Sequence, residues 1–315
     1  MNNIINKNLN NKHRQSGFSL IELMVAVTLG LFLMTALVEV LLSGNRSFTS
    51  ANHLSRLQEN GRMATSMIVT DLKRAGYMGG NSEVGNILGN LGPETPEISC
   101  NTADTTWGRM VTEGVSGLND MNTGYACIPN SSYLRGDVLT VRFASPWVVT
   151  GALSDNLIYL RTSLFEGKIF KGSDGGTIDN NIDDTPQSVH ELLSYAYYVG
   201  NSGRSCAGAP VPALLRVRMG PTGQPETQEL LPGVEHFQVQ YGVDDGVTGL
   251  QYLNANVVTD FNQVTSARIW LLIRAECAET GFTDGKTYTL GGQTYTPGDG
   301  FRRQLYSSVI MLRNG

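Results

Sequence analysis

The chain has few cysteines, and none of the motifs that usually mark catalysis, nucleotide binding or metal binding. Its four cysteines, Cys100, Cys127, Cys206 and Cys277, lie far apart with no C-x-x-C pair, so metal and redox spacings are absent. There is also no G-x-S-x-G elbow, P-loop, H-E-x-x-H helix or G-x-G-x-x-G turn after a strand. We therefore predict a chain that is not an enzyme and that holds no cofactor and no metal.

Histidine is equally scarce, with His13, His53, His190 and His236 scattered along the chain. His236 falls in a predicted strand, where a lone histidine is more often a rim or hydrogen-bonded core residue than a catalytic base. A nucleophile with its base and orienting group is not indicated by any local pattern.

Basic residues are outnumbered, at 23 Lys and Arg against 28 Asp and Glu, for a formal charge of −5. Residues 1–17 contain Lys7, Lys12 and Arg14 but no acid, so a chain without them would carry −8. An acidic protein is poorly suited to phosphate backbones. We expect no direct binding to nucleic acid.

Proline is missing between Phe18 and Pro93, so nothing in that interval forces a helix to kink. The interval begins with 25 residues, Phe18 to Leu42, in which only Glu22 and Glu39 are charged. About 20 apolar residues suffice to cross a bilayer as a helix. A carboxylate within such a span costs roughly 2.5–3.5 kcal/mol on insertion scales, so Glu22 needs a partner; we attach no role to Glu39.

After Leu42 the pattern becomes amphipathic, with apolar residues three and four positions apart. They are Leu54, Leu57, Ala64, Met67, Ile68, Leu72 and Ala75. A helix from Phe18 to about Ala75 would be roughly 87 Å long at 1.5 Å per residue. Gly76 and Gly79-Gly80 supply its stop. We expect the first half to lie in lipid or a filament core and the second to pack on a globular head.

The start of the span resembles type IV prepilins. Their leader is basic and ends in glycine before a Phe-[ST]-Leu-Ile-Glu-Leu core, and Gly17-Phe18-Ser19-Leu20-Ile21-Glu22-Leu23 matches it at every position. The resemblance implies a leader of residues 1–17, cleavage by a prepilin peptidase between Gly17 and Phe18, and N-methylation of Phe18. Glu22 would then pair with the Phe18 amine of a neighbouring subunit and set the axial register, since breaking a buried ion pair costs roughly 3–5 kcal/mol. The alternative is a Glu22 that is simply neutral in the membrane.

Further segments resemble the PilW family of minor pilins. They are Gln58-Glu59-Asn60-Gly61-Arg62, Asp71-Leu72-Lys73-Arg74-Ala75-Gly76-Tyr77, Ala267-Arg268-Ile269-Trp270-Leu271-Leu272, Arg302-Arg303-Gln304-Leu305 and Arg313-Asn314. The prepilin motif covers about a tenth of the chain. The PilW segments are scattered over the rest.

Four cysteines in an exported chain indicate two disulfides, for which three connectivities are open. We favour Cys100–Cys127, which closes a local loop, and Cys206–Cys277, which can join two parts of one sheet. The first would staple residues 79–135, a stretch of little periodicity in which short strands can be hidden.

Alternating apolar and polar residues predict half-buried antiparallel strands in the remainder. The predicted strands are Asp137–Phe143, Leu157–Arg161, Leu192–Val199, Ala213–Met219, Val234–Tyr241, Ala267–Ala275 and Tyr306–Arg313. Ile269-Trp270-Leu271-Leu272-Ile273 is apolar throughout, which suggests a central strand. Two segments, Asp174–Asp184 and Thr283–Gly300, are predicted surface loops.

The acidic residues suggest one candidate metal, which is calcium. Asp174, Asp179, Asp183 and Asp184 cluster in one predicted loop, and Asp244-Asp245-Gly246 follows a strand. The latter lacks the alternating ligand spacing of an EF-hand. A turn is the simpler interpretation, because Asp-Gly is a common hairpin pair.

The predicted fold class is α+β, a pilin-like arrangement of one very long N-terminal helix packed on a mainly antiparallel sheet. We divide the chain into the leader 1–17, a helix 18–78 with an apolar part 18–42 and an amphipathic part 43–78, and a periplasmic head 79–315.

By resemblance the chain is a minor pilin that helps to initiate type IV pilus assembly within a minor-pilin priming or tip complex. It would thereby support piliation, adhesion and twitching motility. The resemblance implies as partners other minor pilins, the major pilin, the prepilin peptidase and the inner membrane, with a tip adhesin as a further candidate. The protein would sit in the inner membrane with its head in the periplasm, and then at the tip of the extracellular pilus.

Two alternatives stay open. One is a pseudopilin of a type II secretion system, which shares the leader and the helix. The other is a membrane-anchored periplasmic enzyme or receptor, against which Glu22 argues, since a plain anchor gains nothing from a buried acid.

Overall fold

The computed structural model describes residues 17–88, 113–123, 125, 127–174, 187–244, 246 and 249–313. They form two compact units, one ending at Asn52 and the other running from His53 to the C-terminus. We call the second unit the head. One α-helix, one large sheet, a second sheet, a small hairpin and short 3-10 helices make up the described secondary structure.

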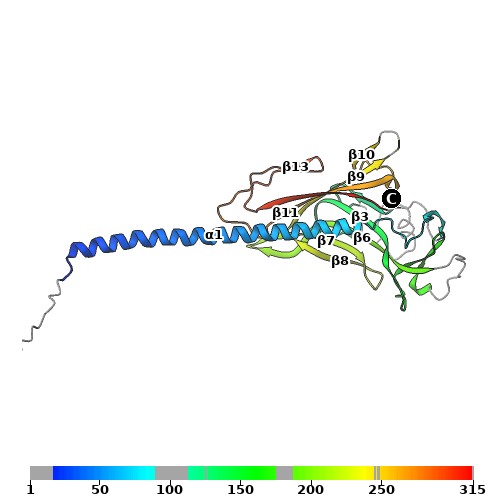
Figure 1. Cartoon of the computed structure of the whole chain (residues 1–315), viewed down its shortest axis with the longest axis horizontal. Coiled ribbons are helices and arrows are strands. Elements are labelled where there is room, and N and C mark those ends of the chain that lie inside the picture. The colour runs from blue at the N-terminus through cyan, green and yellow to red at the C-terminus, as the bar shows by residue number, and fades with distance from the viewer. Residues whose placement is uncertain are drawn as a thin grey trace, which may run out of the picture. The chain divides into compact units, whose positions relative to one another are not determined.

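Helix α1 spans Leu20–Leu72, 53 residues without a break, and is the coiled ribbon of Figure 1. It ends three residues before the predicted Ala75, and residues 73–76 form a turn. Gly76 closes this turn with a positive φ of 71°, and its N–H donates to the Arg142 carbonyl at 3.0 Å. A left-handed glycine after the last helical turn is the usual C-terminal stop. Short 3-10 helices follow at Val84–Asn86, Gly172–Asp174 and Phe261–Gln263.

The large sheet has eight strands. They are β1 (Ile87–Leu88), β2 (Val115–Leu118), β3 (Tyr133–Val148), β4 (Ile158–Thr162), β5 (Gly167–Lys171), β6 (Ser188–Cys206), β7 (Ala209–Met219) and β8 (Pro225–Pro232). All pairs are antiparallel except β1 with β5. The 19-residue strand β6 organises the sheet, because β3 pairs with one of its edges while β4 and then β7 share the other.

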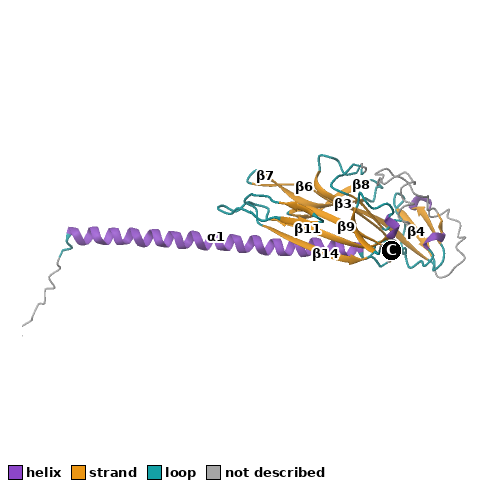
Figure 2. Ribbon diagram, turned by 90° about the horizontal axis from the view of Figure 1, so that it is seen from above, coloured by secondary structure: helices purple, strands orange, loops and turns teal. Residues whose placement is uncertain are grey.

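The second sheet has four antiparallel strands in the order β10-β9-β11-β14. Their bounds are β9 (Val234–Asp244), β10 (Leu250–Asn254), β11 (Val264–Arg274) and β14 (Arg303–Met311). A hairpin of β12 (Tyr288–Leu290) and β13 (Gln293–Tyr295) forms a third, two-stranded sheet. Figure 2 shows the strands of the head from above.

All seven predicted strands are present, most of them longer than predicted, and β11 is an interior strand of its sheet. The predicted α+β class, one long helix on a mainly antiparallel β head, is confirmed, with the strands divided among separate sheets. One prediction was wrong: Thr283–Gly300 is no plain loop, because β12 and β13 lie within it. Hidden short strands are confirmed in residues 79–135 by β1 and β2. Of the predicted loop Asp174–Asp184, residues 175–184 lie outside the described residues.

One face of the second half of α1 is buried in the head. Its members, at spacings of three and four, are Leu57, Gly61, Ala64, Ile68 and Leu72. All of these except Gly61 share a core with Val141 and Tyr197 of the large sheet and with Val239 and Ile269 of the second sheet. Both sheets therefore cover the same helical face (Figure 1). The predicted amphipathic packing is confirmed.

Gly61 is the point of closest approach on this face. A Cβ built there would lie 2.0 Å from the Tyr306 ring of β14, and the Tyr306 hydroxyl donates to the Leu57 carbonyl at 3.1 Å. The glycine weakens the helix by about 1 kcal/mol relative to alanine. In return it admits an aromatic ring against the helix backbone.

We expect Gly61→Ala to destabilise the head by about 1–3 kcal/mol, the usual cost of overpacking, because the Tyr306 ring must move. Denaturant unfolding of the full chain in detergent, followed by near-ultraviolet circular dichroism, measures the change. Gly44→Ala is the matched control, since nothing lies within 4 Å of its added Cβ. An unchanged or raised unfolding free energy in Gly61→Ala would contradict this packing.

Candidate functional site

The start of α1 is capped by Ser19 and Glu22. The Ser19 hydroxyl accepts from the Ile21 N–H at 3.3 Å, and Glu22 Oε2 accepts from the Ser19 N–H at 3.0 Å. This reciprocal arrangement is a capping box, which satisfies helix N–H groups that have no partner in the helix. This role of Glu22 is not among those predicted from the sequence. The spacing of serine and glutamate three residues apart would have indicated it.

The residues of the predicted processing site lie next to this cap and are open to solvent. The Phe18 side chain is 89% exposed, and a Cβ at Gly17 would meet nothing within 4 Å. Gly17, Phe18 and Glu22 thus lie together at the entry of α1. Pairing of Glu22 with a neighbour's amine involves a second chain and stays a prediction.

The span that follows has an apolar surface. Every large apolar side chain from Phe18 to Leu42 is more than half exposed. Among the described residues, α1 is the one helix long and apolar enough to cross a membrane, with a mean hydropathy of 2.4 over its best window. An apolar surface of this extent indicates contact with lipid or with other apolar helices.

Farther along, the two helical segments that resemble PilW make specific contacts in the head. The Asn60 side chain donates to the Pro232 carbonyl at 3.1 Å, and Gly61 receives Tyr306. Asp71, in the second segment, is buried and accepts from the Tyr197 hydroxyl. These contacts fix the helix to both sheets.

Burial raises the pKa of Asp71, and this is only partly offset by Tyr197 and by the charges of Arg216 and Arg74. The Arg216 guanidinium lies 3.8 Å from Asp71 and that of Arg74 lies 3.6 Å away. A buried acid that is held by a hydroxyl and two cations is a positional link rather than a reactive group.

A second buried polar cluster centres on Arg303 of β14, whose side chain is fully buried. It donates Nη2–H to Glu235 Oε1 at 3.0 Å and to Asp299 Oδ2 at 2.8 Å, and Asp284 lies 3.4 Å from Nη1. The Tyr288 hydroxyl donates to Asp284 at 2.9 Å. Arg303 therefore joins β14 to β9 and to the segment that carries β12 and β13.

The charges in this cluster support one another. Burial alone would lower the pKa of Arg303, but its hydrogen bonds to Asp299 and Glu235 outweigh burial and raise that pKa. The hydrogen bonds from Arg303 in turn lower the pKa of Asp299. A guanidinium can bind carboxylates with two parallel bonds each, which fixes their geometry. The sequence marked Arg303 only as part of a family resemblance; its acidic partners are 4 to 68 residues away.

The predicted disulfide Cys206–Cys277 is present, with Cα atoms 5.3 Å apart across 71 residues of chain. It ties the end of β6 to the segment after β11. The second predicted pair, Cys100–Cys127, cannot be followed, because Cys100 lies outside the described residues.

The other polar residues named as candidates from the sequence lie in packed or hydrogen-bonded positions. His190 is buried between the Ser188 hydroxyl and the Ser145 carbonyl, each at 2.7 Å. His236 is partly buried against Tyr295, and desolvation lowers its pKa. Asp244 accepts from the Gly246 N–H at 3.0 Å, as in a turn. Asp179, Asp183, Asp184 and Asp245 lie outside the described residues. Within the described part of the chain, no group of three or more His, Cys, Asp or Glu side chains could hold a metal.

Two regions of the chain match known protein families. Residues 12–41 match the prokaryotic N-terminal methylation motif, and residues 196–314 match type IV pilus-assembly protein W. The first region contains the Ser19–Glu22 cap, and the second contains the Arg303 cluster and the Cys206–Cys277 disulfide. Together the two matches support a PilW-like type IV prepilin.

A solved structure with similarity to this prepilin is the type IV-like pilin TTHA1219 from Thermus thermophilus. It is 17% identical, with a TM-score of 0.29, and the match covers 68% of this chain and 93% of that one. Comparison with curated proteins gave no match.

The family matches agree with the geometry of the site. Pilin-like families are structural, and the apolar first part of α1 with its methylation motif indicates membrane anchoring and incorporation into a pilus. In the PilW-like prepilin the polar contacts described above connect elements of the head to one another. These contacts hold the helix rigidly on the two sheets.

We expect Arg303→Lys to lower the unfolding free energy by about 1–3 kcal/mol, the usual cost of leaving buried acceptors without a hydrogen-bond partner. A lysine keeps the charge but lacks the fork that serves two carboxylates at once. Denaturant unfolding of the full chain in detergent measures this loss.

Arg302→Lys is the matched control, because Arg302 pairs with Glu279 at a partly exposed position, where ion pairs contribute about 1 kcal/mol or less. Equal losses in the two variants would mean that the Arg303 cluster is not what holds β14 in place.

Proposed function

We propose that this PilW-like prepilin is a minor pilin that helps to initiate type IV pilus assembly, as part of a minor-pilin priming or tip complex. One observation carries the proposal: a single chain joins an N-terminal methylation motif at residues 12–41 to a PilW-type head at residues 196–314. Piliation, adhesion and twitching motility would depend on it indirectly.

In this proposal residues 1–17 are a leader that a prepilin peptidase removes before Phe18, and the new Phe18 amine is methylated. The open backbone at Gly17 and the exposed Phe18 support access by these enzymes. The mature chain then begins at Phe18, and the apolar part of its helix is 18–42.

Glu22 would serve two roles, one before assembly and one after it. In the isolated chain it caps α1 through Ser19. In a bundle of apolar helices its carboxylate would pair with the Phe18 amine of a neighbour, which offsets the cost of burying the charge and fixes the axial register. Capping needs only a hydrogen-bond acceptor, whereas pairing needs the negative charge.

The proposed location is the inner membrane with the head in the periplasm, and later the pilus, at its tip. The disulfide Cys206–Cys277 supports an exported head, because disulfides persist in oxidising compartments. The proposed partners are other minor pilins and the major pilin, with a tip adhesin as a further candidate.

Two other functions are less well supported than a minor pilin. A pseudopilin of a type II secretion system would share the methylation motif, but the head matches a pilus-assembly family. A membrane-anchored periplasmic enzyme or receptor could use Glu22 to cap its helix, but it would gain nothing from a negative charge inside its anchor.

We expect Glu22→Gln to abolish incorporation into pili and to leave membrane insertion intact. Glutamine can still cap Ser19, so the loss would report the charge and not the helix start. Immunoblots of sheared pili and of membrane fractions measure the two outcomes. Glu39→Gln, which removes the other acid of the span, is the control and should incorporate normally. Normal incorporation of Glu22→Gln would exclude the register role.

We expect an in-frame deletion to remove surface pili while type II secretion continues, because a priming complex acts before filament growth. Removing the retraction motor as well should restore some filaments. Counts of sheared pili and levels of secreted protein decide the matter. Failed secretion with persistent pili would replace the pilus proposal by the pseudopilin.

A further inference from the structure

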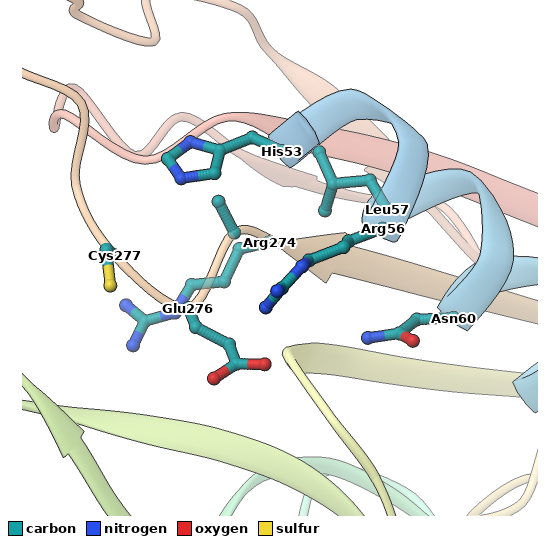
Figure 3. A pocket seen from close by; sticks show the side chains of 8 residues that line it. His53, Arg56, Leu57, Asn60, Arg274, Glu276 and Cys277 are labelled. Carbon is teal, nitrogen blue, oxygen red and sulfur yellow. The ribbon is translucent and has the colours of Figure 1, made fainter. Parts of the chain in front are cut away.

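A small pocket lies on the head between α1 and the segment that follows β11, as Figure 3 shows. Its volume is about 80 Å³, several times the roughly 10–15 Å³ that one water needs. The helix supplies His53, Arg56, Leu57 and Asn60, and the facing segment supplies Arg274, Ala275, Glu276 and Cys277. Arg274 touches the Arg303 cluster through an ion pair with Glu235 at 3.8 Å, and none of these residues belongs to the cap of α1.

The walls of the pocket are fixed in place. The Arg274 N–H donates to the Gly233 carbonyl at 2.7 Å, and the Ala275 N–H donates to the Arg302 carbonyl at 2.8 Å. Cys277 is bonded to Cys206. On the helix side, Leu57 is buried in the core and Asn60 binds the Pro232 carbonyl. A ligand would enter a preformed space, as in most small-molecule sites.

Two buried nitrogen atoms at this pocket have no hydrogen-bond partner, Arg274 Nε and His53 Nδ1. The Arg274 side chain is only 10% exposed, and a buried donor without an acceptor is unfavourable. Glu279, the carboxylate nearest to His53 Nδ1, is 4.0 Å away and is held by Arg302. A guanidinium N–H can only donate, so the missing partner of Arg274 is an acceptor.

The charges around the pocket also call for an anion. Burial lowers the pKa of Arg274, and the charge of Glu235, 3.8 Å away, offsets this only in part. Arg56 forms no ion pair with any residue that the structure describes. In Figure 3 its side chain reaches from the helix towards the segment that carries Glu276, yet Glu276 is likewise in no ion pair within the described chain.

We infer that this pocket binds a carboxylate or another small oxyanion between Arg56 and Arg274. The planar guanidinium fork matches the geometry of such groups, and the Arg274 Nε–H gains the acceptor that it lacks. His53 adds a third donor when its Nδ1 carries a proton. The oxyanion belongs either to a soluble acid or to an Asp or Glu side chain of a neighbouring subunit.

The first test uses the full chain in detergent, titrated separately with acetate and with inorganic phosphate in a calorimeter. We expect saturable binding of at least one probe above a chloride background of equal ionic strength. Arg56→Gln should weaken that binding about tenfold or more, since a hydrogen bond to a charged group contributes roughly 1.5–3 kcal/mol. Arg62→Gln is the matched control, an exposed arginine of the same helix that does not line the pocket, and should bind normally.

The Glu276→Gln variant distinguishes two explanations: a pocket that binds anions, and a weak electrostatic attraction between Arg56 and Glu276. If the pocket binds anions, removing the only acid that lines it strengthens binding. If Arg56 and Glu276 merely attract each other, Glu276→Gln and Arg56→Gln lower stability alike and neither changes an anion titration. No saturable binding, an effect that chloride reproduces, or an equal loss in Arg62→Gln would overturn the inference.

An incorporation experiment in cells distinguishes the two sources of the oxyanion. If a neighbour supplies the carboxylate, which rests on the proposed assembly function, Arg56→Gln reduces the protein in sheared pili several-fold relative to Arg62→Gln. If a soluble acid binds, both variants are incorporated equally and only the titration changes. The titration does not depend on assembly, so failure of the pocket and failure of the proposed function give different results.

Discussion

The packing of one helical face against two sheets is the constraint on which the head depends. Leu57, Ala64, Ile68 and Leu72 are almost fully buried, and they touch core residues from both the eight-stranded and the four-stranded sheet. Each buried aliphatic side chain contributes roughly 1.5–3 kcal/mol relative to an exposed one. Without the helix, the inner faces of both sheets would lose their common partner. The first part of α1 shows no such burial, and its exposed apolar surface suits lipid or other helices instead.

The buried polar groups serve this packing by fixing which elements meet. Asp71 connects the end of α1 to Tyr197 on β6 and to Arg216 on β7, and Arg303 connects β14 to β9 and to the hairpin segment. Apolar contacts are not directional, so they tolerate small shifts of a helix along a sheet. Charged hydrogen bonds with defined geometry do not. Such links are a physical reason for burying charges that contribute little net stability.

Sequence reasoning succeeded where the pattern is local. The helical stripe, the seven alternating strands and the apolar interior strand β11 follow from side-chain periodicity, which reports burial directly. Prediction failed where the structure of a segment depends on contacts with residues far along the chain. Thr283–Gly300 looked like a loop because its glycines and acids are typical of turns, yet Tyr288 and Leu290 pack on Leu272 and Asp284 and Asp299 bind Arg303. The capping role of Glu22 was readable from its spacing to Ser19 and was overlooked beside the membrane argument.

The sequence by itself determined the membrane-competent helix, the prepilin motif, the strand content and the favoured pairing of Cys206 with Cys277. All of these depend on composition, on short-range spacing or on the small number of possible cysteine pairs. Only the tertiary structure decided that the strands divide into separate sheets, that Gly61 receives Tyr306, and that Arg303 gathers three acids. It alone also placed His53 and Arg56 opposite Arg274. The reason is that these arrangements join residues tens to hundreds of positions apart, and no local pattern encodes which distant side chain will fill a given space.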